Sequence, residues 1–293
     1  MKIQKVLKTL LVLSLFVSLL FTANGANAAS PKTAYVNTQT TLNVRSAPNT
    51  KAKIVGSLSS GATVNVYAKL NSGWSEIFYK NKKAYVSTRY LKFYTTIKVT
   101  KHTYKGLSDL SYAQVSGMKN KTAEKKINQI LLNEAQRSYK SYLAIQADEK
   151  RDKGETWCTE FTCDYEYITS YKVKYNDGER LSLLVYDYTY EGGAHGMSYA
   201  EGFNFNSSGS RVKISNILTS KAKMEKVRTY AYNYLSKHEP TRDFVQKRSD
   251  VPMNSNSQFY FAHGGIYLIY QEYDVAAYAA GNPVLKIPSS IYN

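Results

Sequence analysis

The side chains best suited to acid–base or metal chemistry in this chain are four histidines and the acids near one of them. The histidines are His102, His195, His238 and His263. None lies in a His-Glu-x-x-His motif or another close pairing that would hold zinc, so the sequence predicts no metal site. His195 follows two acids, Asp187 and Glu191, on a tyrosine-rich stretch. A general base needs a group that orients it, and the spacing places none.

His195 stands in a Gly-Gly-Ala-His-Gly run over residues 192–196. One interpretation is functional, as a general base or a ligand contact that the flanking Gly193 leaves accessible. The other is structural, a turn in which glycines adopt positive φ and the imidazole caps backbone groups. The pattern favours a structural turn over catalysis, so we expect no enzyme.

The N-terminal segment has the three parts of a secretory signal peptide. Three lysines precede an apolar run over residues 10–21, and Ala26, Asn27 and Ala28 form a small-residue cleavage site. The alternative is an uncleaved membrane anchor, but the run is shorter than the roughly 20 residues that a spanning helix needs. We expect cleavage after residue 28 and no membrane segment in the mature protein. The remaining net charge of +14 favours an anionic partner, unless the lysines are only solvated surface residues.

Cys158 and Cys163, separated by four residues, are the only cysteines of the chain. In an exported protein we expect them to form a disulfide with each other. The alternatives are a reactive thiol or a two-cysteine metal site. A thiol protease would need one of them free. The sequence contains no phosphate-binding glycine loop and no nucleophile elbow, so it predicts no cofactor.

Residues 33–93 have the pattern of a small all-β domain. Short segments of alternating apolar residues, such as Val64 and Val66, are separated by turn clusters at 46–49, 59–61 and 71–73. About five short strands in some 60 residues indicate a closed or nearly closed barrel.

The run from Leu42 to Pro48 resembles the opening signature of the bacterial SH3-type domain, and Gly73-Trp74, Ala84-Tyr85 and Tyr90-Leu91 follow in that family's order. Ala84 departs from the family's usual glycine. The resemblance implies a non-catalytic module that holds proteins on peptidoglycan. Its candidate ligand-binding residues are Asn43, Arg45, Trp74 and Tyr85. For Trp74 and Tyr85 the alternative is a place in the core.

Residues 104–293 are expected to form a larger α+β domain with an antiparallel sheet and two main helices. The helices are predicted at 122–146 and 221–235, the second with Ser220 as N-cap. Strict alternation predicts strands at 165–175 and 181–190, which are joined by a hairpin turn at Asn176-Asp177-Gly178. A third strand is predicted at 199–205, and a last hairpin over 259–273.

Several stretches of this region resemble the extracytoplasmic domain of anti-sigma factors that sense lysozyme, a domain type that also precedes the catalytic part of some peptidoglycan deacetylases. They include the 192–196 run, residues 214–218 and the segment from Tyr273 to Gly281. Ala277 departs from the family's proline, and the family's sigma-binding segment is not found. The resemblance implies a capacity to bind a lysozyme-like muramidase, with Tyr190, Gly193, His195 and Tyr278 as candidate binding residues.

These observations predict a secreted, cell-wall-associated binding protein. The SH3-type module would bind peptidoglycan or another anionic wall polymer, and the larger domain a muramidase-like protein or wall glycan. Nucleic acid is not an expected partner of an exported chain. The alternative function is a cell-wall-modifying enzyme with Asp187, Glu191 and His195 as its site.

Overall fold

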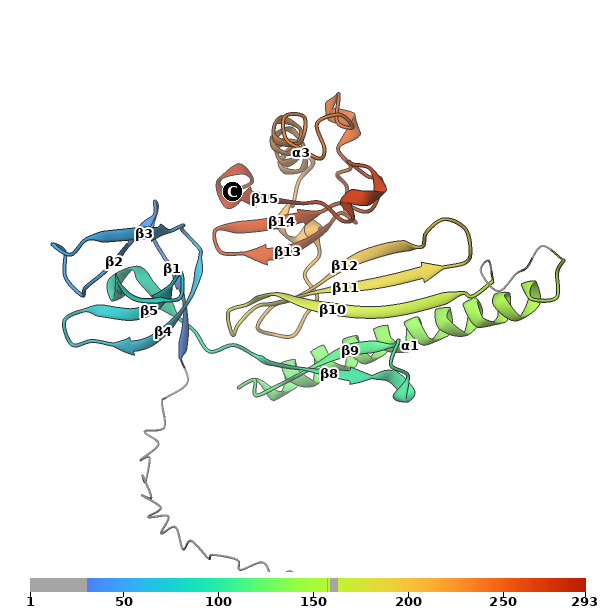
Figure 1. The fold of residues 1–293 in the computed structure, drawn as a ribbon, viewed down its shortest axis with the longest axis horizontal. Coiled ribbons are helices and arrows are strands. Elements are labelled where there is room, and N and C mark those ends of the chain that lie inside the picture. The colour runs from blue at the N-terminus through green and yellow to red at the C-terminus, as the bar shows by residue number, and fades with distance from the viewer. Residues whose placement is uncertain (1–30, 157, 159–162) are drawn as a thin grey trace, which may run out of the picture. The chain divides into compact units, whose positions relative to one another are not determined.

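The computed structural model describes residues 31–156, 158 and 163–293. The expected signal peptide at 1–28 lies outside the described residues. The first part of the described chain is a seven-stranded antiparallel sheet in the order β3-β2-β6-β5-β4-β1-β7 (Figure 1). Its strands are β1 (Lys32–Val36), β2 (Leu42–Arg45), β3 (Ile54–Leu58), β4 (Thr63–Lys69), β5 (Trp74–Tyr79), β6 (Lys82–Ser87) and β7 (Leu91–Phe93), with a short 3-10 helix, η1 (Thr88–Tyr90), before β7.

The sheet curls around a small apolar core, as its alternating pattern predicts. Val44, Ile77 and Val86 are fully buried, whereas neighbouring positions on the strands face outward. Ala84, the departure from the SH3-type pattern, is also buried in this core. Within the described residues, β3 and β7 end the strand order without pairing to each other, so the sheet is an open roll and not a closed barrel.

The larger region is α+β, as predicted, but its strands form three sheets and not one. The first is the hairpin β8 (Lys98–Thr103) and β9 (Ser111–Ser116), the second is β10 (Glu166–Asn176), β11 (Leu181–Tyr190) and β12 (Met197–Phe205), and the third is β13 (Gln258–Ala262), β14 (Gly265–Ile269) and β15 (Val284–Pro288). The helices are α1 (Lys121–Asp152), α2 (Ile214–Ile217) and α3 (Lys221–Leu235). Short 3-10 helices are η2 (Tyr104–Gly106), η3 (Arg248–Asp250), η4 (Tyr278–Ala280) and η5 (Ser289–Ile291).

Helix α1 is longer than the predicted 122–146. Its last turns are polar but consist of good helix formers, and Arg151 pairs with Asp148 along the helix. At the other end Asn120 caps the helix by accepting a hydrogen bond from the amide of Ala123. The predicted range and Ser220 cap of α3 are confirmed.

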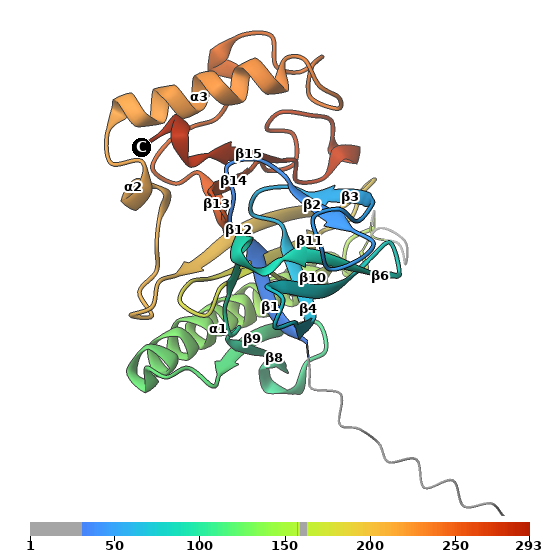
Figure 2. The same ribbon diagram turned by 90° about the vertical axis from the view of Figure 1, so that its left-hand side faces the viewer.

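The two faces of β10 and β11 have different neighbours. Odd-numbered residues such as Leu181 and Leu183 pack with Ile127 and Leu131 of α1 and with β9. The third sheet is covered by α3, which buries Val227, Ala231 and Leu235 against it (Figure 2). Even-numbered residues of β10 are exposed. On the side away from α1, Ser182 and Leu184 of β11 are buried against the third sheet, so the layers leave only the outer part of that side, mainly on β10, open to solvent.

Candidate functional site

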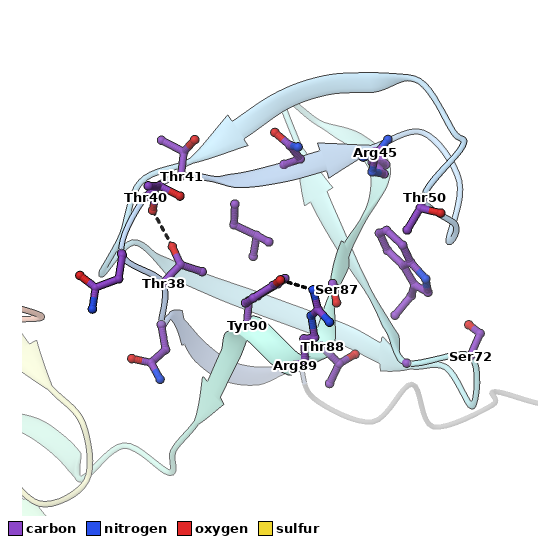
Figure 3. A pocket seen from close by; sticks show the side chains of 16 residues that line it. Thr38, Thr40, Thr41, Arg45, Thr50, Ser72, Ser87, Thr88, Arg89 and Tyr90 are labelled. Carbon is purple, nitrogen blue, oxygen red and sulfur yellow. Dashed lines mark hydrogen bonds between the residues drawn. The ribbon is translucent and has the colours of Figure 1, made fainter.

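A groove of about 910 Å³ lies on the seven-stranded module (Figure 3). It is lined by residues 37–43 after β1, by the turn at 72–74, by residues 87–90 around η1, and by Arg45 and Thr50. Turns with positive φ at Gly61 and Gly73 shape the neighbouring loops. The groove therefore arises where three loops meet at one end of a small rolled sheet.

The groove combines two guanidinium groups with aromatic rings and threonine hydroxyls. The Arg45 guanidinium donates a hydrogen bond of 2.7 Å to the carbonyl of Ala52, which fixes it on the groove wall. The Arg89 guanidinium lies 4.4 Å from the centre of the Tyr90 ring and also bonds its hydroxyl. Trp74 is half-buried and lines the groove. Such a site can stack an apolar or sugar surface and pair with a carboxylate.

The structure places three of the four residues expected on this module in the groove. Asn43, Arg45 and Trp74 line it, and Asn43 is exposed. Tyr85 does not line it; it is half-buried, and its backbone pairs with that of Arg45. The threonines at 38, 40 and 41 and the Arg89–Tyr90 pair were not expected from the sequence, although the Thr-Arg-Tyr run at 88–90 is a visible cationic and aromatic signal.

His195 lies in a cluster of aromatic side chains in the larger region. Its ring stacks on Tyr278 with centroids 3.8 Å apart and planes 19° apart. The hydroxyl of Tyr273 lies 3.3 Å from His195 Nε2, and the carbonyl of Gly196 lies 3.0 Å from Nδ1. Tyr190 donates a hydrogen bond of 3.0 Å to the carbonyl of Gly193. His195 and Tyr278 are therefore in contact, although they come from segments far apart in the sequence, and Tyr190 and Gly193 are joined to each other in the turn that precedes His195.

The segment opposite His195 is fixed by hydrogen bonds to β12. The carboxylate of Glu272 accepts from the amide of Ser198 at 2.9 Å, and the side-chain oxygen of Gln271 accepts from the amide of Ala200 at 2.9 Å. Tyr273 then adopts a φ of 66° and is 57% exposed. Gly193 has a φ of 89°. This agrees with the structural interpretation, in which glycines of the turn adopt positive φ. The exposed surface of this His195 cluster is aromatic and partly preorganised.

Asp187 belongs to a different group of charges. It lies 3.6 Å from Arg137 of α1, which also pairs with Glu134 and, at 3.3 Å, with Glu201 of β12. Burial is the main reason why the pKa of Asp187 is raised to about 6, and the neighbouring Glu134 adds to the effect while Arg137 opposes it.

Asp187, Glu191 and His195, the site of the alternative enzymatic interpretation, have no connected geometry. Within the residues that the structure describes, no hydrogen bond joins any two of them. Asp187 faces α1, whereas His195 contacts Tyr278. An acid with a pKa of about 6 can act as a general acid or base, but here it is tied to an ion-pair network.

Cys158 and Cys163 form a disulfide, as predicted, with Cα atoms 5.6 Å apart. Over the described ranges no three residues among His, Cys, Asp and Glu are grouped as metal ligands. No helix in the described part of the chain is long and apolar enough to cross a membrane.

Comparison with known families confirms the two resemblances seen in the sequence. Residues 40–92 match the bacterial SH3 domain, residues 97–198 match the family described as deacetylase PdaC, and residues 206–290 match a family described as protein of unknown function DUF3298. The chain carries a bacterial SH3 domain. It is followed by a region similar to the PdaC and DUF3298 families. The SH3 domain and the disulfide indicate a wall-associated, extracytoplasmic protein.

A curated relative is the uncharacterized protein YfhK of Bacillus subtilis (strain 168), which is 44% identical over 63 residues. The match covers 21% of this chain and 37% of YfhK, so the chain spans little more than a third of that relative. Among solved structures, a DUF3298 family member from Bacteroides fragilis is 17% identical, with a TM-score of 0.47 over 67% of this chain and 89% of its own. A DUF3298 protein from Pseudomonas aeruginosa PAO1 is 16% identical, with a TM-score of 0.41 over 67% and 90%.

Proposed function

We propose that this protein is secreted and binds the bacterial cell wall through the groove of its SH3 domain, without catalysing a reaction. The observation that carries the proposal is the convergence of Asn43, Arg45 and Trp74 on one groove. Peptidoglycan offers sugar rings and peptide carboxylates, which fit an aromatic ring beside guanidinium groups. The net positive charge of the chain adds a non-specific attraction to an anionic wall.

Co-sedimentation of the full-length protein with purified peptidoglycan at physiological salt tests the anchoring role. A Trp74→Ala variant should bind at least about 30-fold more weakly, as expected for a buried aromatic anchor in an interface. Asn43→Ala, at an exposed position, should weaken binding without affecting the fold. The matched control is Tyr67→Ala, which removes an aromatic ring that is 46% exposed on the same module and outside the groove.

Two results would contradict this assignment. One is a folded Trp74→Ala protein that sediments like the parent protein. The other is binding that disappears completely when salt is raised to about 1 M, where the screening length falls to about 3 Å. In that case the charge of the chain, and not the groove, would account for the attraction.

For the larger domain we propose binding of a muramidase-like protein at the His195 cluster. The proposal is supported by the meeting of the 190–196 turn with Tyr273 and Tyr278, because exposed tyrosines on a fixed backbone are typical of interface hot spots. Muramidases of the lysozyme type are basic, so contact would need acids near the cluster, and Glu191, Glu272 and Asp274 are the nearest in sequence.

Titration calorimetry of the full-length protein with a muramidase tests this role. Tyr278→Ala should weaken binding about tenfold or more. Tyr234→Ala is the matched control, since Tyr234 also stacks on a histidine, His238, with centroids 4.0 Å apart, but on α3. An absence of heat at tens of micromolar from the folded protein would remove the muramidase from consideration.

The proposed absence of catalysis has a separate test. Purified wall incubated with the protein should release neither soluble sugar nor acetate. Release that is lost in His195→Ala or Asp187→Asn would support the alternative, a wall-modifying enzyme.

A further inference from the structure

The side of β10 and β11 that faces away from α1 carries lysines and tyrosines that neither proposed site uses. Lys172 and Lys174 are exposed on the even-numbered side of β10, and Tyr186 lies on the same side of β11. Tyr267 of β14, which is half-buried, continues this side onto the third sheet, and Tyr260 of β13, which is 8% exposed, lies buried beside it. We call these five residues the lysine–tyrosine face.

The cations and rings of this face alternate in space. Lys172 Nζ lies 5.4 Å from the centre of the Tyr186 ring, and Lys174 Nζ lies 5.1 Å from that of Tyr260. The rings of Tyr260 and Tyr267 are stacked, with centroids 4.9 Å apart and planes 18° apart. The half-buried rings of Tyr186 and Tyr267 therefore lie in one cluster with the buried Tyr260, and an ammonium group lies beside Tyr186 and another beside Tyr260.

A packed apolar floor holds the rings in place. Leu184, Ala200, Ile269 and Tyr260 form a buried cluster, and the half-buried Tyr186 and Tyr267 pack against it. Burial also raises the pKa of Tyr260 to about 12, so its hydroxyl remains a hydrogen-bond donor across the physiological range. Because the rings are fixed before any ligand arrives, binding would cost little side-chain entropy.

The positive charge of the face is not neutralised within the protein. In the part of the chain that the structure describes, neither Lys172 nor Lys174 has a carboxylate within 4.0 Å. Burial, and then the charge of Lys172, hold the pKa of Lys174 below its ordinary value. On β15, Lys286 lies directly opposite Tyr267 and adds a third cation. An anion would relieve this repulsion.

We propose that the lysine–tyrosine face binds a glycan whose sugars carry carboxylates. Sugar rings would stack on the partly exposed rings of Tyr186 and Tyr267 while the carboxylates pair with the lysines. An acidic peptide would use the lysines but leave the fixed ring faces without a specific role. The proposal is independent of the SH3 groove. It gives the larger domain a second site, for wall glycan, in addition to the His195 cluster.

Titration calorimetry of the full-length protein with polygalacturonate, a polymer of uronic acid, tests the proposal. Dextran serves as the neutral polymer and poly-glutamate as the acidic peptide. The double variant Lys172→Gln/Lys174→Gln should bind polygalacturonate about tenfold more weakly. Tyr186→Leu keeps the apolar packing and should lose about as much, whereas Tyr186→Phe keeps the ring and most of the affinity. The charge-matched control is Lys125→Gln/Lys226→Gln, which removes two exposed helical lysines elsewhere.

Four results would overturn the proposal. Equal loss in the Lys125→Gln/Lys226→Gln control would show attraction by total charge alone. Loss in Asn43→Ala/Trp74→Ala would assign the glycan to the SH3 groove, and unchanged binding there separates this site from the anchoring role. Poly-glutamate binding as tight as polygalacturonate binding would identify an acidic-peptide site. Unchanged binding in the double lysine variant, whose side chains are exposed and not needed for folding, would exclude the face.

Discussion

Replacing Asp187 by asparagine should stabilise the protein at neutral pH. The Asp187 side chain is only 18% exposed, and its Oδ1 has no hydrogen-bond partner among the described residues. Burial raises the pKa of this carboxyl to about 6, from an ordinary value of 3.8. At pH 7 the folded protein therefore holds an ionised group in a place that favours the neutral form. Asparagine has nearly the same shape and carries no charge.

The pKa difference sets the magnitude and the sign. Between 3.8 and about 6 the folded state binds this proton more tightly than the unfolded state does, so the carboxyl destabilises the fold as pH rises through that window. At about 1.4 kcal/mol per pH unit, ionisation costs at most about 3 kcal/mol. The pKa already includes the attraction of Arg137, so we expect Asp187→Asn to gain about 1–3 kcal/mol at pH 7 and nothing near pH 4.

Urea denaturation of both proteins at several pH values between 4 and 7 checks this expectation. The quantity of interest is the difference in unfolding free energy between variant and parent, because titrations common to both cancel. The control is Glu191→Gln, which removes an exposed acid shortly after Asp187 in the sequence. This variant should show no such difference in unfolding free energy. A difference that is constant across pH, or a loss of stability at pH 7, would refute the argument from burial.

Two further predictions concern covalent and backbone constraints. Intact mass should increase by about two hydrogens on reduction, and replacing Cys158 and Cys163 by serine should cost about 2 kcal/mol of unfolding free energy, the low end for a short loop; two free thiols in the oxidised protein would contradict the pairing. Gly209→Ala should lower the melting temperature far more than Gly193→Ala. Both glycines have positive φ, but only at Gly209 would the added carbon meet backbone, 2.6 Å from the carbonyl oxygen of Ala123; equal effects would show that the contact is not rigid.

Elements with a strict local pattern were predictable from the sequence. The alternation over 165–175 and 181–190 and the Asn176-Asp177-Gly178 turn correspond to β10, β11 and the hairpin between them. Elements fixed by tertiary contacts were not. Strand β15 ends in Pro288, which cannot donate to a ladder, and it is held by pairing with β14. The division of the strands into separate sheets likewise depends on which faces the helices cover.

The candidate sites also differ in how far the sequence alone could predict them. Asn43, Arg45 and Trp74 were predictable because they lie within a short stretch of sequence that matches the signature of the SH3-type domain. The network of Glu134, Arg137, Asp187 and Glu201 could not, because it joins one helix and two strands. Its trace in the sequence is subtle: Asp187 occupies the same strand face as Leu181 and Leu183.

The same alternation of side chains along β11 also explains the position of the lysine–tyrosine face. Asp187, a charged residue on the buried side of β11, needs an opposite charge nearby, and Arg137 of α1 partly meets this need. The period of two that places Asp187 against α1 places Tyr186 and Tyr188 on the opposite side, where, among the described residues, the third sheet packs on part of β11 and no helix covers the strands. A sheet that only needed to be solvated there would be served by small polar residues. Packing between the second and third sheets accounts for the tyrosine rings. It does not account for two neighbouring lysines that have no carboxylate within 4.0 Å among the described residues, and an anionic ligand explains these better than solvation does.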